Sequence, residues 1–190
     1  MAQNEAVSRR VDAQRNREKI LAAAQAAFAD PDADASMAEI ARRAKIGSAT
    51  LYRNFADRRA LLEALYGEEI AAICHAAETC EGATAGARLA AWLRRFYSYF
   101  LNKRVLAGEL LELVGETSPV FRTGFARVVG AAELLVQAAH RSGELREDLT
   151  AEQVLAFVAS ISNIPGDQDF RSPILTAALD ALWTSRPSEE

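Results

Sequence analysis

The chain has 190 residues, half of them hydrophobic and a quarter charged, which is the composition of a globular rather than a disordered protein. No apolar run approaches the ~20 residues that span a bilayer, and the start is too polar for a secretory signal, so we expect a cytoplasmic protein that does not bind membranes. Cys74 and Cys80 have neither disulfide-framework nor metal-ligand spacing, so we expect packing or surface thiols.

The net charge of −4 argues against a nucleic-acid partner until its distribution is considered. Residues 1–66 hold 11 Lys and Arg against 9 Asp and Glu, whereas residues 67–190 hold 11 against 17. A basic front and an acidic rear are expected of a DNA-binding head on a body with another task. An excess of two charges is small and can arise by chance, but the clustering of arginines over residues 9–17 supports the first interpretation.

The first predicted helix begins at an N-cap, Asp12, and ends near Ala29. Residues 1–10, which precede it, are polar and expected to be mobile. Basic residues near the start of this helix are placed to meet phosphates. Its inward face should carry Ile20, Ala24, Ala27 and Phe28, which share one side of a helix and would pack on the elements that follow.

A short helix is predicted after Ser36. The pair Ser36 and Glu39 is typical of a capping box, in which the hydroxyl accepts from a free backbone amide and the carboxylate reaches back to the cap. One buried stripe follows at helical spacing, formed by Met37, Ile40, Ala41 and Ala44. Lys45, Ile46 and Gly47 then make a tight turn.

A second short helix is predicted from about Ser48 to Asn54, with Leu51 and Phe55 facing inward. The outward residues are then Ser48, Ala49, Tyr52, Arg53 and Asn54. Two such short helices cannot be stable alone. Joined by a tight turn they form the helix-turn-helix unit, whose second helix enters the DNA major groove.

A longer helix should begin after an N-cap at Asp57 and continue to about Thr79. Its amide end carries a partial positive charge that suits a phosphate, and Arg58 and Arg59 reinforce that end. This helix would join the head to the body.

The run IARRAKIGSATLYRNFADRRALLEALY, residues 40–66, resembles the helix-turn-helix signature of the TetR family of transcriptional regulators. The resemblance extends upstream over residues 15–28. Two departures concern backbone geometry: Lys45 stands where the family often has Gly, which makes a left-handed turn less favourable, and Pro31 replaces a more usual Gly. The matching positions are Ile40, Ala41, Ala44, Ile46, Thr50, Leu51, Tyr52, Phe55, Arg58, Leu61 and Leu62.

Helical periodicity continues behind a breaker cluster at residues 81–86, and no stretch shows sustained strand alternation. The predicted body helices start near residues 87, 105 and 119, after a cap at Thr150, and after Ser172-Pro173. The fold class is therefore all-α, with about nine helices. The resemblance implies a three-helix DNA-binding head, residues 1–66, and a helical ligand-binding and dimerisation body, residues 67–190.

An aromatic stripe on the first body helix has two interpretations. Most such stripes are core. The resemblance implies instead a small-molecule pocket enclosed by the middle helices, and helical bundles do build ligand sites between their helices. The candidate lining residues are Trp92, Phe96, Tyr99, Phe100, Phe121 and Phe125.

The last two helices alternate small and large residues, which permits close helix approach. Intrachain packing explains this pattern as well. The resemblance implies a homodimer through these two helices, and two-fold pairing is also what a small DNA-binding head needs for specificity. The small residues are Ala156, Ala159, Ser160, Ala177, Ala178 and Ala181.

No residue pattern indicates catalysis, a metal or a cofactor. The only histidines, His75 and His140, have no Ser, Asp or Cys at the spacing of a triad or a zinc site. We therefore expect no enzyme, and an α-helical hydrolase would lack a nucleophile and base.

The resemblance implies a regulator, most simply a repressor that a small hydrophobic effector releases from double-stranded operator DNA; activation stays open. Phosphate contacts are predicted for Ser36, Thr50, Tyr52 and Arg58. Base contacts are predicted for Ser48, Ala49, Arg53 and Asn54, with Arg53 suited to guanine and Asn54 to adenine. The alternative is an α-helical small-molecule-binding or protein-interaction module without DNA binding, which the capping box and the basic head disfavour.

Overall fold

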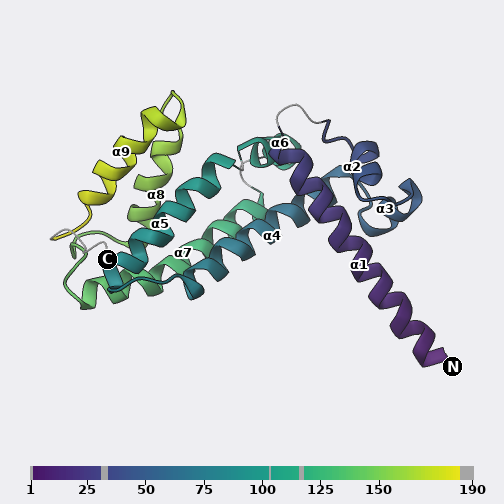
Figure 1. Ribbon diagram of the computed structural model, residues 1–190, viewed down its shortest axis with the longest axis horizontal. Coiled ribbons are helices and arrows are strands. Elements are labelled where there is room, and N and C mark those ends of the chain that lie inside the picture. The colour runs from purple at the N-terminus through teal and green to yellow at the C-terminus, as the bar shows by residue number, and fades with distance from the viewer. Residues whose placement is uncertain (1, 31–33, 103, 116–117, 185–190) are drawn as a thin grey trace. The chain divides into compact units, whose positions relative to one another are not determined.

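A computed structural model describes residues 2–30, 34–102, 104–115 and 118–184 (Figure 1). Within these residues the backbone forms nine α-helices and no β-strand beyond one isolated bridge, Leu145 to Trp183. The predicted all-α class is confirmed. The helices are α1 (Ala2–Ala29), α2 (Met37–Arg43), α3 (Ser48–Asn54), α4 (Arg58–Thr79), α5 (Ala85–Asn102), α6 (Arg104–Val114), α7 (Pro119–Arg141), α8 (Ala151–Ser162) and α9 (Gln168–Asp180).

The chain forms two compact units. The head unit comprises residues 1–68 and 105–116, and the body unit comprises residues 69–104 and 117–190. Helix α6 therefore groups with the head, although the sequence predicted it within the body. The functional boundary at residues 66 and 67 stays a prediction, because compactness alone assigns no function.

In the head unit, α1, α2 and α3 contact one another in all three pairs. Figure 1 shows α2 and α3 beside the C-terminal part of α1, while its N-terminal part extends beyond them. The inward faces predicted from helical spacing are largely confirmed. The buried residues of this core include Ile20, Ala24, Ala27, Ile40, Ala41, Leu51, Phe55, Leu61 and Leu62.

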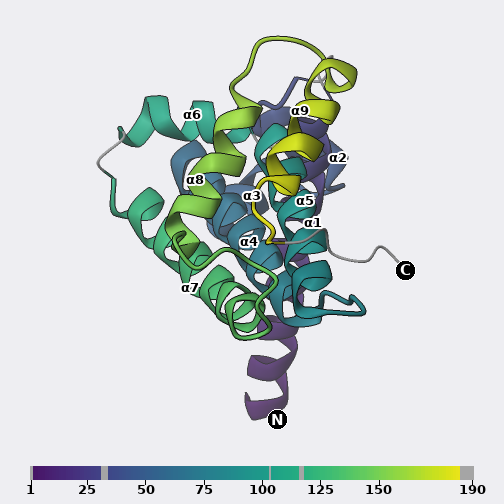
Figure 2. The ribbon, with the colours of Figure 1, turned by 90° about the vertical axis from the view of Figure 1, so that its left-hand side faces the viewer.

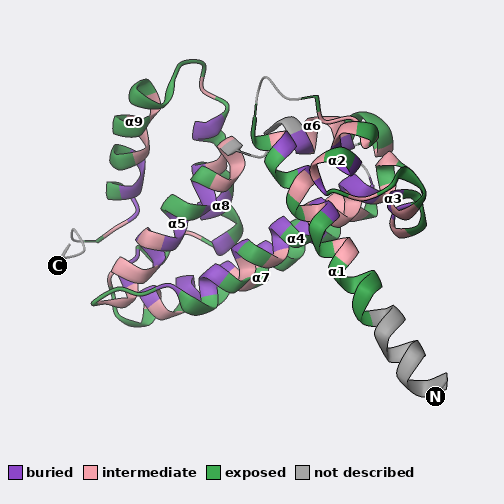
Figure 3. Cartoon of the chain, turned by 45° about the vertical axis from the view of Figure 1, so that its right-hand side comes forward, coloured by how far each residue is buried: buried purple, intermediate pink, exposed green. Residues whose placement is uncertain are grey.

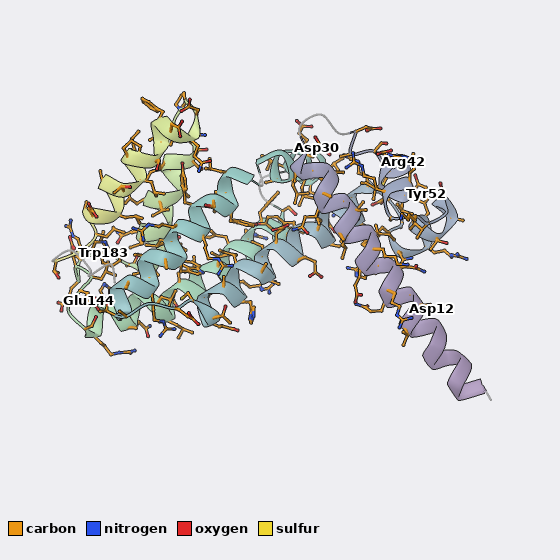
Figure 4. The ribbon with its side chains drawn as sticks, viewed as in Figure 1. Asp12, Asp30, Arg42, Tyr52, Glu144 and Trp183 are labelled. Atoms are coloured by element: carbon orange, nitrogen blue, oxygen red, sulfur yellow. The ribbon has the colours of Figure 1, made fainter. Side chains whose placement is uncertain are left out.

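The predicted start of α1 is wrong. The helix begins at Ala2, so Asp12 lies inside it instead of capping it (Figure 4). Residues 2–11 contain neither Gly nor Pro and are rich in good helix formers. A single residue of the N-cap type does not end a helix when nothing before it breaks one.

In the body unit, α5 packs against α7 and α8, and α8 packs against α7 and α9 (Figure 2). Trp92 and Phe96 of α5 are fully buried, and the Trp92 indole Nε1 donates to the Ile73 carbonyl oxygen at 3.0 Å. Figure 3 shows the alternation of buried and exposed residues along α7 that an amphipathic helix requires. The body therefore has its own apolar core.

Glu144, in the loop after α7, holds the start of α5. Its carboxylate accepts from the Thr84 hydroxyl, from the Gly86 amide at 3.0 Å and from the Ser142 hydroxyl at 2.6 Å. Hydrogen bonds from Ser142 and then Thr84 hold the pKa of Glu144 below its usual value. Figure 4 shows Glu144 close to Trp183, where the C-terminal segment returns to this loop.

The predicted cap of α8 at Thr150 is confirmed, whereas the predicted start of α9 is wrong. Helix α9 begins at Gln168, and Pro173 lies inside it. The Asp167 carboxylate accepts from the Phe170 amide at 2.8 Å and caps the helix. This cap, and not Pro173, determines where α9 begins. The proline removes one backbone hydrogen bond of the helix but does not prevent the first turn from forming before it.

Candidate nucleic-acid interface

The turn between α2 and α3 is a Schellman motif. The Lys45 amide donates to the Arg42 carbonyl at 3.1 Å, and the Ile46 amide donates to the Ala41 carbonyl at 3.1 Å. This pair of hydrogen bonds requires a residue in the left-handed backbone region just after the C-cap, and Lys45 adopts φ 55° there. The turn therefore forms with a lysine where glycine is the easier residue, and it fixes the angle at which α3 leaves α2.

Ser36 caps α2, but the predicted capping box is only half formed. The Glu39 amide donates to the Ser36 hydroxyl oxygen at 3.3 Å, as predicted. The reciprocal bond is replaced, because the Ser36 amide donates to Asp34 at 2.9 Å. The Ser36 hydroxyl donates to the same Asp34 carboxylate at 2.7 Å. A hydroxyl already committed to a carboxylate is a poor phosphate donor.

The Glu39 carboxylate is instead engaged by the two arginines of α2. Arg42 donates to it twice, at 2.7 Å each, and Arg43 donates at 2.8 Å. The hydrogen bonds from Arg42 and then Arg43 lower the pKa of Glu39 to about 2. At neutral pH the carboxylate is therefore charged, and it balances part of the positive charge of Arg42 and Arg43. Figure 4 labels Arg42 in the head unit.

Helix α3 carries the predicted outward face. Ser48, Ala49, Tyr52 and Arg53 are exposed, with Tyr52 at 52%, while Leu51 is fully buried. The helix contains no acidic residue. An exposed aromatic and an exposed arginine on a helix without carboxylates suit contact with a polyanion.

Two polar residues of α3 bind back to the helix. The Asn54 amide nitrogen donates to the Thr50 carbonyl oxygen at 2.8 Å, and Asn54 is half-buried. Arg53 Nη2 donates to the Thr50 hydroxyl oxygen at 2.9 Å while the side chain stays exposed. The guanidinium keeps further donors for a base edge, whereas the Asn54 amide has lost one of its two donors.

Arg58, predicted to contact phosphate, is held inside the head unit. Its Nη1 donates to the Ala35 carbonyl oxygen at 2.6 Å, and its guanidinium forms an ion pair with Glu109 of α6. The same group lies 5.5 Å from the Phe28 ring centroid. The arrangement ties α1, the segment before α2, and α6 to the start of α4, so the guanidinium supports the head.

Three further cations of the head, Arg15, Lys19 and Lys45, are exposed and have no carboxylate partner within the described part of the chain. Arg15 and Lys19 occupy the middle of α1, and Lys45 lies in the turn. Arg17 lies 4.7 Å from the Phe55 ring centroid, a cation–π contact that packs α1 on the end of α3. The side chains of Arg9 and Arg10 are not among those that the structure describes.

The predicted effector aromatics divide into core and surface. Trp92 stacks on Phe96 at 5.6 Å between centroids, and Phe96 meets Phe100 edge-on at 4.9 Å. Tyr99 and Phe121 are half-buried, and Phe125 is exposed. The core interpretation therefore holds for Trp92 and Phe96, while a pocket lined by all six residues stays a prediction.

A groove of about 410 Å³ lies between α4 and α5 in the body unit, and Tyr99 is the predicted effector residue that lines it. No cluster of three or more His, Cys, Asp or Glu is arranged for a metal among the described residues. The described helices include none long and apolar enough to cross a membrane.

The fold and the α2–turn–α3 unit define a helix-turn-helix DNA-binding regulator. Residues 20–65 match the family described as bacterial regulatory proteins of the tetR family. Residues 84–182 match the description "Transcriptional regulator SbtR-like, C-terminal domain". The chain belongs to the TetR family, and it is a ligand-responsive DNA-binding transcriptional regulator, a class that typically represses.

Solved structures agree with this assignment. A TetR transcriptional regulator of Streptomyces coelicolor is 34% identical over 90% of this chain and 99% of its own, with a TM-score of 0.73. The TetR transcription regulatory protein of Mycobacterium vanbaalenii is 27% identical over 92% of this chain and 99% of its own, with a TM-score of 0.68. No curated protein sequence matches the chain.

Proposed function

We propose that the protein is a homodimeric repressor that binds operator DNA through α3 and is released by a small hydrophobic molecule. The observation that carries the DNA-binding part is α3 itself. Its outward face is exposed, has no carboxylate, and is set at a fixed angle by the Schellman turn. Residues 1–66 would then bind DNA, and residues 67–190 would bind the effector and the second subunit.

The side chains around α3 take different roles in this proposal. Arg53 reads a base, with Ser48 and Ala49 allowing close approach of the helix to the groove floor. Thr50, Tyr52, Arg15 and Lys19 contact phosphates on either side. Ser36, Asn54 and Arg58 support the interface, because their polar groups are engaged within the head.

The test of DNA binding is selection of an operator from random duplexes, followed by titration of that operator and of scrambled DNA. We expect the operator to bind more tightly, with affinity that falls steeply as salt rises, by about 0.9 log units per log unit of salt for each phosphate neutralised. Equal affinity for both DNAs at every salt concentration would overturn the proposal.

Helices α8 and α9 support the proposed dimer. They pack against each other and leave small or apolar residues exposed on their outer faces: Ala156, Phe157 and Ala177. Phe157 is 44% exposed, and a dimer interface here would remove this apolar surface from water. Ala178, predicted to face the partner, is buried within the subunit, so Ala177 is the better position to probe.

We expect Phe157→Glu to give monomers that keep their helical content, because the new carboxylate would be buried without a partner in the dimer. Leu113→Glu is the matched control, since Leu113 of α6 is 50% exposed and outside α8 and α9. Sedimentation measures both variants. A Phe157→Glu protein that stays dimeric would move the interface elsewhere.

Release by the effector would be a population shift between two arrangements of the heads, only one of which fits adjacent major grooves. Two features support a route for it: α4 is one continuous helix from Arg58 to Thr79, and Arg58 binds Glu109 of α6. A protein working in this way needs no catalytic group and would act in the cytoplasm, where bacterial DNA lies.

A further inference from the structure

The groove between α4 and α5 is unlike the rest of the body in its charge. Residues 67–190 carry 11 Lys and Arg against 17 Asp and Glu. The groove has two arginines, Arg94 and Arg95, against a single carboxylate, Glu69. A locally positive groove in an acidic body favours an anion over a cation.

The two walls of this groove provide different chemistry. The α4 wall supplies Glu69, Ala72, Ile73 and Ala76, and the α5 wall supplies Arg94, Arg95, Ser98 and Tyr99. A volume of about 410 Å³ falls in the range of small-molecule sites, roughly 300–1,000 Å³. One wall is thus mostly apolar and the other is mostly polar.

The apolar wall is held in place by the core. Ile73 and Ala76 are buried, and the Ile73 carbonyl accepts the indole N–H of Trp92, which is fully buried on α5. Glu69 is only 7% exposed, although it also lines the groove. Arg95 is exposed and has no carboxylate partner among the described residues.

We propose that this groove binds a small amphipathic monocarboxylate, whose charged end meets Arg95 and whose apolar part lies against Ile73 and Ala76. The guanidinium fork matches a carboxylate in geometry. The charges of Arg94, Arg95 and Glu69 sum to +1, which one carboxylate balances. A dianion would leave excess negative charge beside Glu69. Binding of this ligand does not depend on the proposed function; only the further step, that the ligand is the effector that releases DNA, rests on it.

The test uses the full-length protein and calorimetric titration with 4-ethylbenzoate, its neutral analogue 4-ethylbenzamide, and the dianion terephthalate. We expect 4-ethylbenzoate to bind and both of the others to bind roughly tenfold or more weakly, because each loses the charge match. Equal binding of the carboxylate and the amide would overturn the proposal, as would the absence of carboxylate binding at millimolar concentration.

Three variants locate the site. Arg95→Gln should weaken 4-ethylbenzoate binding roughly tenfold or more, since it removes the free cation. Ala72→Trp should abolish binding by filling the groove, and Ala72 is exposed, so the fold should tolerate the larger side chain. Arg141→Gln, an exposed arginine of α7 outside the groove, should bind as the parent does. Circular dichroism checks that all three variants fold.

A matching loss in Arg95→Gln and Arg141→Gln would show general charge attraction and overturn the site. Operator binding without ligand separates this inference from the proposed function. A protein that binds operator but no carboxylate would refute the groove alone, and one that binds carboxylate in the groove but no operator would refute the repressor. Loss of operator binding on adding 4-ethylbenzoate, absent in Arg95→Gln, would identify the groove as the effector site.

Discussion

Helices α2 and α3 have seven residues each, lie side by side in the head unit, and differ in how their charges are handled. The two arginines of α2 are both engaged by Glu39. Helix α3 has no acidic residue, and within the described residues Arg53 bonds only to the Thr50 hydroxyl. One helix neutralises its own cations, and the other leaves its cation available.

Whether an arginine is paired with a carboxylate distinguishes residues that stabilise the head from residues that could contact DNA, which a count of basic residues cannot do. Arg42, Arg43, Arg58 and Arg59 are all paired with carboxylates in the head unit. A cation that must leave a carboxylate to reach a phosphate gains less from DNA than one that does not. The proposed DNA contacts therefore come from α3 and the middle of α1, and Lys45 of the turn is one further candidate, because it is exposed and has no carboxylate partner among the described residues.

The largest effect is expected for Leu51→Ala, which removes a fully buried side chain from the face of α3 opposite Arg53. Truncating a buried leucine costs roughly 2–5 kcal/mol. We expect the head to lose stability and operator binding together, measured by thermal melting and DNA titration. A variant that stays as stable as the parent would mean that α3 is not anchored by this residue.

Arg53→Ala should come next, with a loss of about 1–3 kcal/mol for the operator and much less for scrambled DNA. Folding should be unaffected because the side chain is exposed. Arg42→Ala is the matched control on α2, and we expect it to change operator binding little. Equal losses for the two variants, or equal losses on both DNAs, would contradict the contrast between the helices.

Glu39→Gln is designed to make α2 resemble α3. It frees Arg42 and Arg43, so binding to any DNA should tighten and its salt dependence should steepen by up to about 0.9 log units for each arginine that contacts a phosphate.

In the parent protein, DNA binding should not tighten through Glu39 between pH 5 and 8, because Glu39 with a pKa of about 2 stays charged there. Its stabilising effect, present above the usual carboxyl pKa, should fade as the pH falls toward 2. An unchanged salt slope in Glu39→Gln would place α2 away from the DNA backbone.

Much of the head could be predicted because its signals are local. The bounds of α3 and the cap of α4 at Asp57 follow from neighbouring residues, and the Ala60 amide does donate to that carboxylate at 2.7 Å. The buried stripes also follow from helical spacing alone. Resemblance to the TetR family then identified the whole unit correctly.

Other errors concern choices of partner that sequence spacing does not decide. Arg58 pairs with Glu109, 51 residues away, and no local pattern predicts that ion pair. Two acidic residues lie near Ser36 in the sequence, Asp34 and Glu39, and spacing alone cannot decide which carboxylate its amide and hydroxyl bind; both bind Asp34. Ala178 shares a helix with Ala177 but faces inward, because the position of α8 decides which side is covered.

The smallest expected effect tests the turn that joins the two helices. Lys45 adopts φ 55°, a backbone region that costs an L-residue about 1 kcal/mol and glycine nothing. Lys45→Gly removes that cost but gains entropy in the unfolded chain, so we expect net stabilisation of no more than about 1 kcal/mol.

Lys45→Ala separates conformation from charge, because alanine loses the ammonium group and keeps the strained backbone. If Lys45 contacts phosphate, both variants should flatten the salt dependence of DNA binding by about the same amount, close to 0.9 log units. Only Lys45→Gly should melt at a higher temperature, by about 2–4 °C per kcal/mol in a chain of this size. Equal melting temperatures would mean that the turn stores no strain at Lys45. A salt slope unchanged in both variants would show that this lysine does not contact DNA, so that the cationic contacts would come from Arg53 and the basic residues of α1 alone.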